Sequence, residues 1–255
     1  MSEKTPVVVL AAGHISTSLA RATGAAAKGM IEVGGRPIID RLLEGLEGAK
    51  LAGEVCVVCA ENSPLIEHVG ERAVECKGET IVDSLRCGLE ALGRPERILI
   101  VTGDLPLLSA ESVDHFLGQV LHSDASIVYS VVAKRDCERV LPGGRRTYFR
   151  LLDGVFTGGN IAVMRREFLD EQGQQLERAF SMRKNPLALS ALLGWGFVFR
   201  FVAGRLSLAQ ILARAGAILG ADVDAVISPY PEVGFDVDKP GHIATVEALI
   251  ARSML

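Results

Sequence analysis

The stretch that most constrains this chain is the apolar run ending at Leu10 and the loop that follows it. Three valines and a leucine lead directly into Ala11-Ala12-Gly13. A short β-branched run that ends in small residues is typical of a buried parallel strand entering a close-approach loop. The loop is rich in Gly, Ala, Ser and Thr, so its backbone amides can approach an anion such as a phosphate.

Two features at the far end of this loop indicate what it binds. Lys28 is an isolated cation among small apolar residues, and Gly34-Gly35 then turns the chain into an expected helix, Ile38 to Leu46. Together with the strand they indicate a nucleotide site, although strand, glycine loop and helix alone are common in α/β proteins. It is neither a Walker loop nor a dinucleotide fingerprint, because no Ser or Thr follows Lys28 and GxGxxG is absent after the strand.

Composition and charge exclude several classes of protein. Of the 255 residues, 49% are hydrophobic and 23% charged, which predicts a globular chain with a full core. A net charge of −4 argues against a nucleic acid or an anionic membrane as partner. We find no membrane-spanning apolar run and no signal-peptide pattern, so we expect a cytoplasmic protein. Cys56 and Cys59 lie on opposite faces of an expected strand, which predicts buried free thiols rather than zinc ligands.

The loop and the residues after it resemble a known family. LAAG, an uncharged loop and K-G-M-I-E-V-G-G-R-P-I-I are similar to the nucleotidyltransferase pattern LAAG…K-x-L-x-x-V-x-G-x-P-L-L, above all in the molybdenum-cofactor guanylyltransferase-like enzymes. The family usually has LAAGxGxRM, whose second glycine and arginine are missing here, and Arg21 is the candidate replacement for that arginine. The resemblance implies that an NTP is held by Leu10, Ala11, Ala12, Gly13 and Lys28.

A second block resembles the cytidylyltransferases. G-E-T-I-V-D-S-L-R-C-G-L-E-A-L is similar to G-x-x-x-R-x-x-S-V-x-x-G-L-x-A-L, in which the serine and the preceding glycine lie against the nucleobase. The resemblance implies this role for Gly78 and Ser84. The alternative is that both residues only shape a turn and the helix expected from Glu79 to Leu92.

Aspartates at two distant places are the candidate metal ligands. Asp104 follows the apolar strand 97–101, at the position where open α/β sheets bind ligands, although it could also cap the loop. G-D-L-P-L-L-S-A-E resembles D-x-P-L-L-T-x-E, whose aspartate binds magnesium. G-F-D-V-D-K-P resembles D-x-D-T-P, and Asp236 and Asp238 share a face if the segment is extended, with helix capping by Asp238 as the alternative. We therefore expect the carboxylates of Asp104 and Asp238 within about 6–8 Å, with Asp236 as reserve ligand.

The block T-G-G-N lies in a strand expected from Val155 to Met164, after a hairpin turn at Asp153-Gly154. Adjacent glycines weaken a strand, so a close approach of a ligand or of backbone, or a bulge, explains them. The resemblance implies that the acceptor is bordered by Thr157, Gly158, Gly159 and Asn160.

Alternation of strands and helices predicts a three-layer α/β fold with a mostly parallel Rossmann-like sheet and a small antiparallel segment. The resemblance implies the glycosyltransferase-A-like version of this fold. We expect a single domain over residues 1–255, with a nucleotide half at about 1–110 and an acceptor half at 111–255. A further strand is expected from Phe197 to Val202.

The resemblance implies a Mg²⁺-dependent enzyme that transfers an NMP from an NTP to a phosphorylated small-molecule acceptor and releases pyrophosphate. Lys28 and Asp104 are then the catalytic residues, and a phosphate acceptor arrives ionised without a general base. Two alternatives stay open: a glycosyltransferase that uses a nucleotide-sugar, and a nucleotide-binding regulatory domain without catalysis. The nucleobase, the acceptor and the oligomeric state are not specified by these motifs.

Overall fold

The computed structural model describes residues 4–140, 146–182 and 185–253. Over these ranges, eight strands form one mixed sheet. In spatial order its strands are β10 (Val223–Ser228), β7 (Ile127–Ala133), β9 (Gly154–Arg165), β6 (Arg97–Thr102), β1 (Thr5–Leu10), β4 (Ala52–Ala60) and β5 (Ala73–Cys76), with β8 (Phe149–Leu151) paired to β9. The β10–β7, β6–β1, β1–β4 and β4–β5 pairs are parallel, and β9 is antiparallel to β6, β7 and β8. The expected mostly parallel sheet with an antiparallel segment is confirmed.

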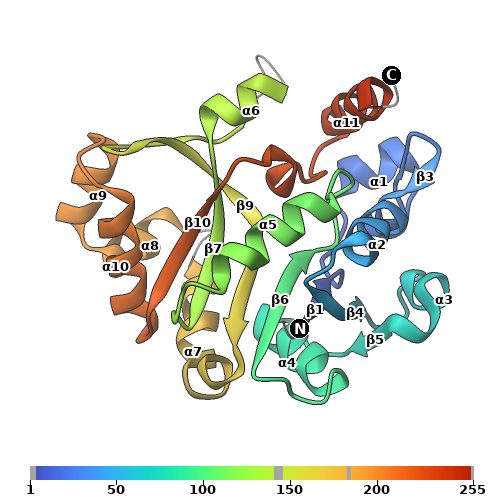
Figure 1. Cartoon of the computed structure of the whole chain (residues 1–255), viewed down its shortest axis with the longest axis horizontal. Helices are drawn as coiled ribbons and strands as arrows, with labels where there is room; N and C mark the ends of the chain where they lie inside the picture. The colour runs from blue at the N-terminus through green and yellow to red at the C-terminus, as the bar shows by residue number, and fades with distance from the viewer. Residues whose placement is uncertain (1–3, 141–145, 183–184, 254–255) are drawn as a thin grey trace.

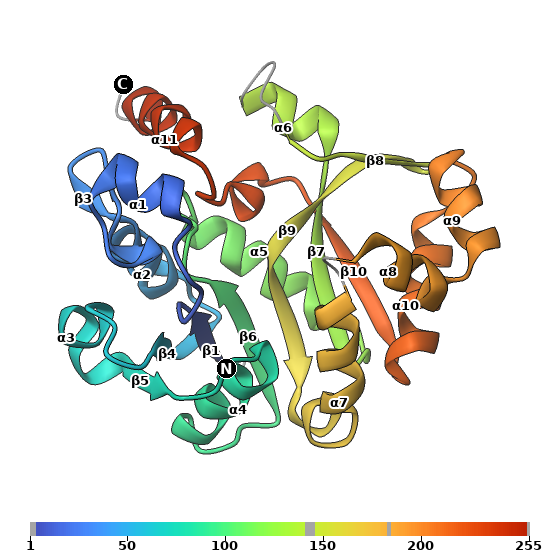
Figure 2. The same cartoon turned by 180° about the vertical axis from the view of Figure 1, so that it is seen from behind.

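Helices cover both faces of the sheet (Figures 1 and 2). They are α1 (Thr17–Thr23), α2 (Ile38–Gly48), α3 (Leu65–Val69), α4 (Ile81–Ala91), α5 (Ala110–Val120), α6 (Lys134–Val140), α7 (Arg166–Met182), α8 (Pro186–Leu193), α9 (Trp195–Val202), α10 (Leu208–Leu219) and α11 (Pro240–Ser253), with 3-10 turns η1 (Lys28–Met30), η2 (Gly70–Arg72) and η3 (Pro231–Gly234). The core on one face includes residues of α2 and α5, and the core on the other includes α4 and α7. None of the helices in the described ranges is long and apolar enough to span a membrane.

The alternation of side chains along the central strands builds these two cores. Val7 and Val9 of β1 pack with α2 and α5, whereas Val8 packs with α4. On β4, Cys59 lies in the core with α2 and α5, and Cys56 lies in the core with α4. Both are free thiols and buried. Burial raises the pKa of Cys56 to about 12 and that of Cys59 to about 11. The prediction that these thiols are buried on opposite faces is confirmed.

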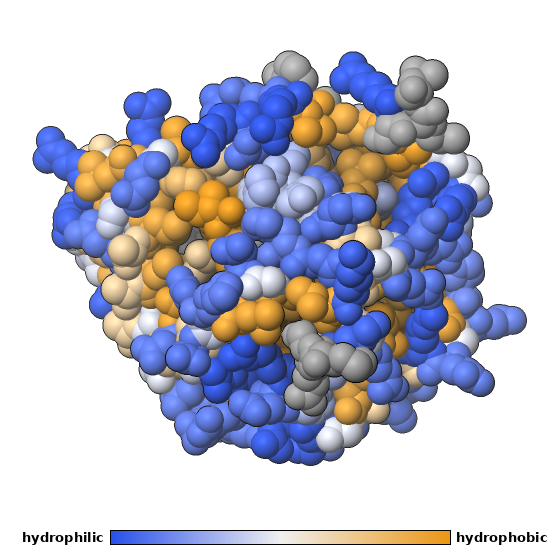
Figure 3. Space-filling view, viewed as in Figure 1, coloured by the Kyte–Doolittle hydropathy of each residue, from blue (hydrophilic) through white to orange (hydrophobic). Residues whose placement is uncertain are grey.

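The strand expected from Phe197 to Val202 is wrong, because this segment forms the helix α9. Phenylalanines at every second position fit a strand, but Phe197 and Phe201 are four residues apart and pack together into the cluster around β8. Phe199, between them, is 73% exposed. Apolar residues gather over the α9 and α10 region of the molecule, whereas much of the remaining face in this view is hydrophilic (Figure 3).

The segment after Gly13 is more ordered than the expected loop. Ser16 accepts a hydrogen bond from the backbone amide of Leu19 and so caps α1. Gly34 and Gly35 have φ angles of 55° and 72° and form the turn between β2 (Glu32–Val33) and β3 (Arg36–Pro37). The predicted entry into α2 through this turn is confirmed. A polar insertion follows β7 as α6, and residues 141–145 of it lie outside the described ranges.

Candidate active site

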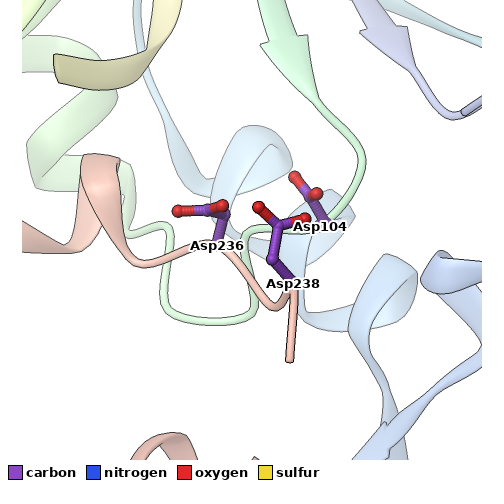
Figure 4. A group of neighbouring side chains, drawn as sticks. All are labelled: Asp104, Asp236 and Asp238. Carbon is purple, nitrogen blue, oxygen red and sulfur yellow. The ribbon is translucent and has the colours of Figure 1, made fainter. Parts of the chain in front are cut away.

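Three aspartates from distant parts of the chain meet at the carboxyl end of the sheet. Asp104 follows β6, and Asp236 and Asp238 lie between η3 and α11 (Figure 4). One carboxylate oxygen from each lies within 4.8 Å of the other two. The segment is held in place because the backbone amide of Val237 donates to the carbonyl of Asp104 at 3.1 Å. The predicted proximity is confirmed, and the metal-binding role of this aspartate triad stays a prediction.

The local sequence explains why Asp236 and Asp238 both reach the site. Val237, between them, is fully buried in an apolar cluster with residues of α1 and α2. In an extended segment the neighbours of an inward-pointing residue point outward, so the two carboxylates share the open face. His242 of α11 fixes this turn, since its Nδ1 lies 3.0 Å from the carbonyl of Asp236 and 3.3 Å from the amide of Asp238.

Lys28 lies between two members of the triad. Its Nζ donates to Oδ2 of Asp104 at 3.0 Å and also to Oδ1 of Asp238. Burial alone would lower the pKa of Lys28, but the two carboxylates outweigh burial and raise it. Burial has the opposite effect on a carboxyl group and raises the pKa of Asp238. The Lys28 ammonium lowers this pKa by more, so the net shift is downward. Both groups of this ion pair are therefore charged at neutral pH.

Asp236 differs from the other two aspartates because Lys28 does not pair with it. Burial, then hydrogen bonding with Asp238 and the charge of Asp104, raises the pKa of Asp236 to about 6. Oδ1 of Asp104 is buried and has no hydrogen-bond partner within the described ranges. The triad thus carries more negative charge than Lys28 neutralises.

A cavity of about 560 Å³ opens beside Lys28 and Asp104. Its lining includes all eight residues that the sequence assigned to the nucleotide: Leu10, Ala11, Ala12, Gly13, Lys28, Gly78, Ser84 and Asp104. Arg21 is exposed on α1 and is not part of this lining. Another hollow of about 630 Å³ lies between α7 and α10, and among the described residues no lysine or arginine lines it to supply the charge that a phosphate needs. The eight residues therefore line one cavity, and their contacts with a nucleotide stay a prediction.

The start of α4 and the residues just before it form part of the cavity wall. Thr80 and Asp83 cap this helix reciprocally. A Cβ at Gly78 would lie 2.1 Å from the Cβ of Asp83, so only glycine fits there. Ser84 is buried, and its Oγ donates to the carbonyl of Thr80 at 3.2 Å, which leaves its oxygen free to accept a hydrogen bond. The structural explanation of both residues therefore holds beside the predicted contact with a base.

The T-G-G-N block lies on β9 against β7. A Cβ at Gly158 would lie 3.1 Å from the hydroxyl of Tyr129, and one at Gly159 would lie 2.0 Å from Oγ of Ser130. The register between β7 and β9 also shifts at this point. Close approach of backbone and a register irregularity thus both account for the glycines. Thr157 is buried, whereas Asn160 reaches the site and donates to Oδ1 of Asp236 at 3.4 Å. Their contact with an acceptor stays a prediction.

Two features of the site are not predicted by the sequence motifs: the position of Arg146 and a disulfide. Arg146 lies 3.9 Å from Oδ1 of Asp236 and 4.7 Å above the ring of Phe235. It belongs to a charged insertion that resembles a solvated loop, and no local pattern marks it. Cys76 and Cys87 form a disulfide that joins the end of β5 to α4. The ring that it closes contains the cavity wall from Lys77 to Ser84.

The family follows from comparison with known proteins. The profile of the MobA-like NTP transferase domain matches residues 7–184, more than half of the chain. The chain belongs to the MobA-like NTP transferase family. It is accordingly a nucleotidyltransferase, as the resemblance of the LAAG and Lys28 motifs implied. Asp236 and Asp238 lie outside the matched range, and the fold brings them to Asp104.

Solved structures agree with this MobA-like assignment. A hypothetical transferase from Thermus thermophilus is 34% identical, with a TM-score of 0.82, and the match covers 94% of this chain and 99% of that one. CMP:2-keto-3-deoxy-manno-octonic acid synthetase, solved with CTP, is 17% identical with a TM-score of 0.61 over 98% and 100% of the two chains. Molybdopterin-guanine dinucleotide biosynthesis protein A from Archaeoglobus fulgidus is 12% identical with a TM-score of 0.56 over 97% and 100%. The last two show the fold alone. No curated protein matches the sequence.

Proposed function

We propose that this MobA-like enzyme transfers an NMP from an NTP to a phosphorylated small-molecule acceptor, with Mg²⁺ as cofactor and pyrophosphate as the second product. One observation carries the proposal: Lys28 and the aspartate triad lie at the edge of a cavity lined by the LAAG loop. We place the nucleotide in the half formed by about residues 1–110, and the acceptor in the half formed by 111–255.

The ligand set of the triad fits a hard divalent cation. Carboxylate oxygens are the protein ligands that Mg²⁺ prefers, and the triad offers three of them within 4.8 Å of one another. Oδ1 of Asp104 is buried without a hydrogen-bond partner among the described residues, and such a cation would satisfy this acceptor. Two of the same carboxylates already hold the Lys28 ammonium, so the site selects positive charge. When bound, a divalent ion neutralises phosphate charge and orients the two substrates.

The chemistry requires positioning and charge rather than a covalent nucleophile. An oxygen of the acceptor phosphate forms a bond to the α-phosphorus, while the bond from that phosphorus to the bridging oxygen breaks. The electron pair of the broken bond leaves with pyrophosphate. Amides of Ala11, Ala12 and Gly13 hold the triphosphate, and Lys28 donates to oxygens on which negative charge accumulates. The phosphate nucleophile is already ionised, so no general base takes part.

The test is pyrophosphate release, measured with each of the four NTPs, Mg²⁺ and a panel of phosphorylated acceptors. We expect release with one nucleotide, dependent on both Mg²⁺ and an acceptor, and loss of release in Asp104→Asn. Consumption of a nucleotide-sugar without pyrophosphate would instead indicate the glycosyltransferase. Tight nucleotide binding without turnover of any acceptor would indicate the regulatory domain, against which the co-location of Lys28 and the triad argues.

A further inference from the structure

We propose that Arg146 forms the subsite that binds the phosphate group of the acceptor. This inference rests on the proposed function and adds the residue that recognises the second substrate. Lys28 pairs with Asp104 and Asp238, whereas Arg146 faces Asp236. The two cations thus lie beside different members of the triad, an arrangement that fits two anionic substrates bound on its two sides.

The fold holds the Arg146 side chain in one place. Its guanidinium lies over the ring of Phe235 at 4.7 Å, and the side chain is only 13% exposed. A Cβ at Gly234 would lie 2.9 Å from Nη2 of Arg146, so the glycine leaves the space in which the guanidinium lies. Gly234 and Phe235, which hold Arg146 in this way, are the two residues before Asp236 in the chain. The segment that supplies a candidate metal ligand therefore also positions this arginine.

The charge of Arg146 is compensated only in part, by Asp236 at 3.9 Å and by a hydrogen bond with the buried thiol of Cys137. The distance of 3.9 Å from Nη2 to Oδ1 of Asp236 exceeds hydrogen-bond length. Nη1 is buried and has no hydrogen-bond partner in the ranges that the structure describes. A buried cation is costly unless it is paired and hydrogen-bonded. Arg135 and Arg139 in the preceding α6 differ, since both pair with Asp136 and are well exposed.

The position and shape of this group favour a phosphate. The guanidinium is a planar fork that binds phosphate oxygens through two parallel hydrogen bonds. Asp236, which faces Arg146, also accepts a hydrogen bond from Asn160 in the T-G-G-N block. A phosphate held by Arg146 would therefore lie beside the triad on the side of β9. Because the three carboxylates repel an incoming anion, a cation at this place offsets the repulsion.

The experiment measures two bindings separately in the full chain. Calorimetry in the presence of Mg²⁺ first gives the affinity for each NTP. A second titration, with the protein saturated by the NTP that binds tightest, gives the affinity for inorganic phosphate, which serves as the acceptor probe. The variants are Arg146→Gln and Arg146→Lys, with Arg135→Gln as the matched control on the exposed face of α6. Melting temperatures check that each variant is folded.

We expect Arg146→Gln to weaken phosphate binding by about 10- to 100-fold while nucleotide affinity changes less than about twofold, as for loss of a charged hydrogen bond to one substrate. Arg146→Lys should retain part of the affinity, since lysine keeps the charge but not the fork. Unchanged phosphate binding in folded Arg146→Gln overturns the subsite, as does a nucleotide-bound wild type that binds no phosphate. A wild type that binds no NTP refutes the proposed function itself, which is a different result.

Discussion

Replacing Lys28 with methionine removes the ammonium group between Asp104 and Asp238 but keeps an apolar stem of similar length. Under the proposed function, this one change has two opposite effects. Turnover should fall, because the proposed role of Lys28 is to donate to phosphate oxygens that gain negative charge in the transition state. Metal affinity rises, because in the resting protein a divalent ion must displace the lysine from the same carboxylates.

The magnitudes follow from the geometry. Loss of one charged transition-state contact costs about 10²–10³ in rate, or roughly 3–4 kcal/mol. A divalent and a monovalent cation about 4 Å apart repel by about 2 kcal/mol even in water, so Lys28→Met should bind Mg²⁺ roughly tenfold or more tightly. Without metal, loss of the ammonium leaves uncompensated a repulsion of about 3 kcal/mol between carboxylates up to 4.8 Å apart, at an effective dielectric constant of about 20. Exposure of Asp238 screens this to about 1–2 kcal/mol, or about 3–6 °C in melting temperature.

Three measurements check this prediction: pyrophosphate release, Mg²⁺ affinity by calorimetry, and the melting temperature with and without Mg²⁺. Lys50→Met serves as control, because Lys50 is exposed and lies outside the site. The expected pattern for Lys28→Met is lower turnover, tighter metal binding and a lower melting temperature that Mg²⁺ restores. Normal turnover in a folded variant, or Mg²⁺ binding no tighter than in the wild type, would contradict the proposed position of Lys28 between phosphate and metal.

Further predictions concern single contacts. Asp104→Asn should abolish Mg²⁺-dependent activity with little change in melting temperature, since the amide is isosteric and relieves repulsion within the triad. Gly159→Ala should destabilise the protein by about 1–3 kcal/mol, because its Cβ would lie 2.0 Å from Oγ of Ser130; chemical denaturation measures this, and an unchanged midpoint would contradict it. Reduction of the Cys76–Cys87 disulfide, or Cys87→Ser, should lower stability by about 2–3 kcal/mol for so short a ring, seen as a lower melting temperature; equal melting of both forms would disprove the contribution.

The central fold and much of the site could be predicted because they depend on local patterns. Apolar strands that each end in small or acidic residues must place those residues at the same edge of a parallel sheet. This rule predicts that Gly13 and Asp104 lie near each other, whatever the path of the loops, and both line the same cavity. The alternation of Asp236 and Asp238 around the apolar Val237 similarly predicted two carboxylates on one open face.

The parts that could not be predicted depend on contacts across the fold. Period-two and period-four spacing coincide in the phenylalanines of α9, so only packing distinguishes helix from strand there. The pairing of Cys76 with Cys87 depends on how β5 lies against α4. The position of Arg146 depends on the path of an insertion whose composition resembles any charged loop.

The docking of α11 completes the apolar cluster beside the candidate site, and α11 is synthesised long after Lys28. This helix packs on α1 and β2, and its Val246 and the preceding Val237 are buried in one cluster with Leu19 and Ile31, which lie on either side of Lys28. At roughly 5–20 residues per second, a ribosome makes Val246 on the order of 10–40 s after Lys28. A nascent chain therefore holds its nucleotide loop against an incomplete core, and without Asp236 and Asp238, for most of that interval. Under the proposed function, nucleotide transfer therefore requires that the chain through Asp238 has left the ribosome.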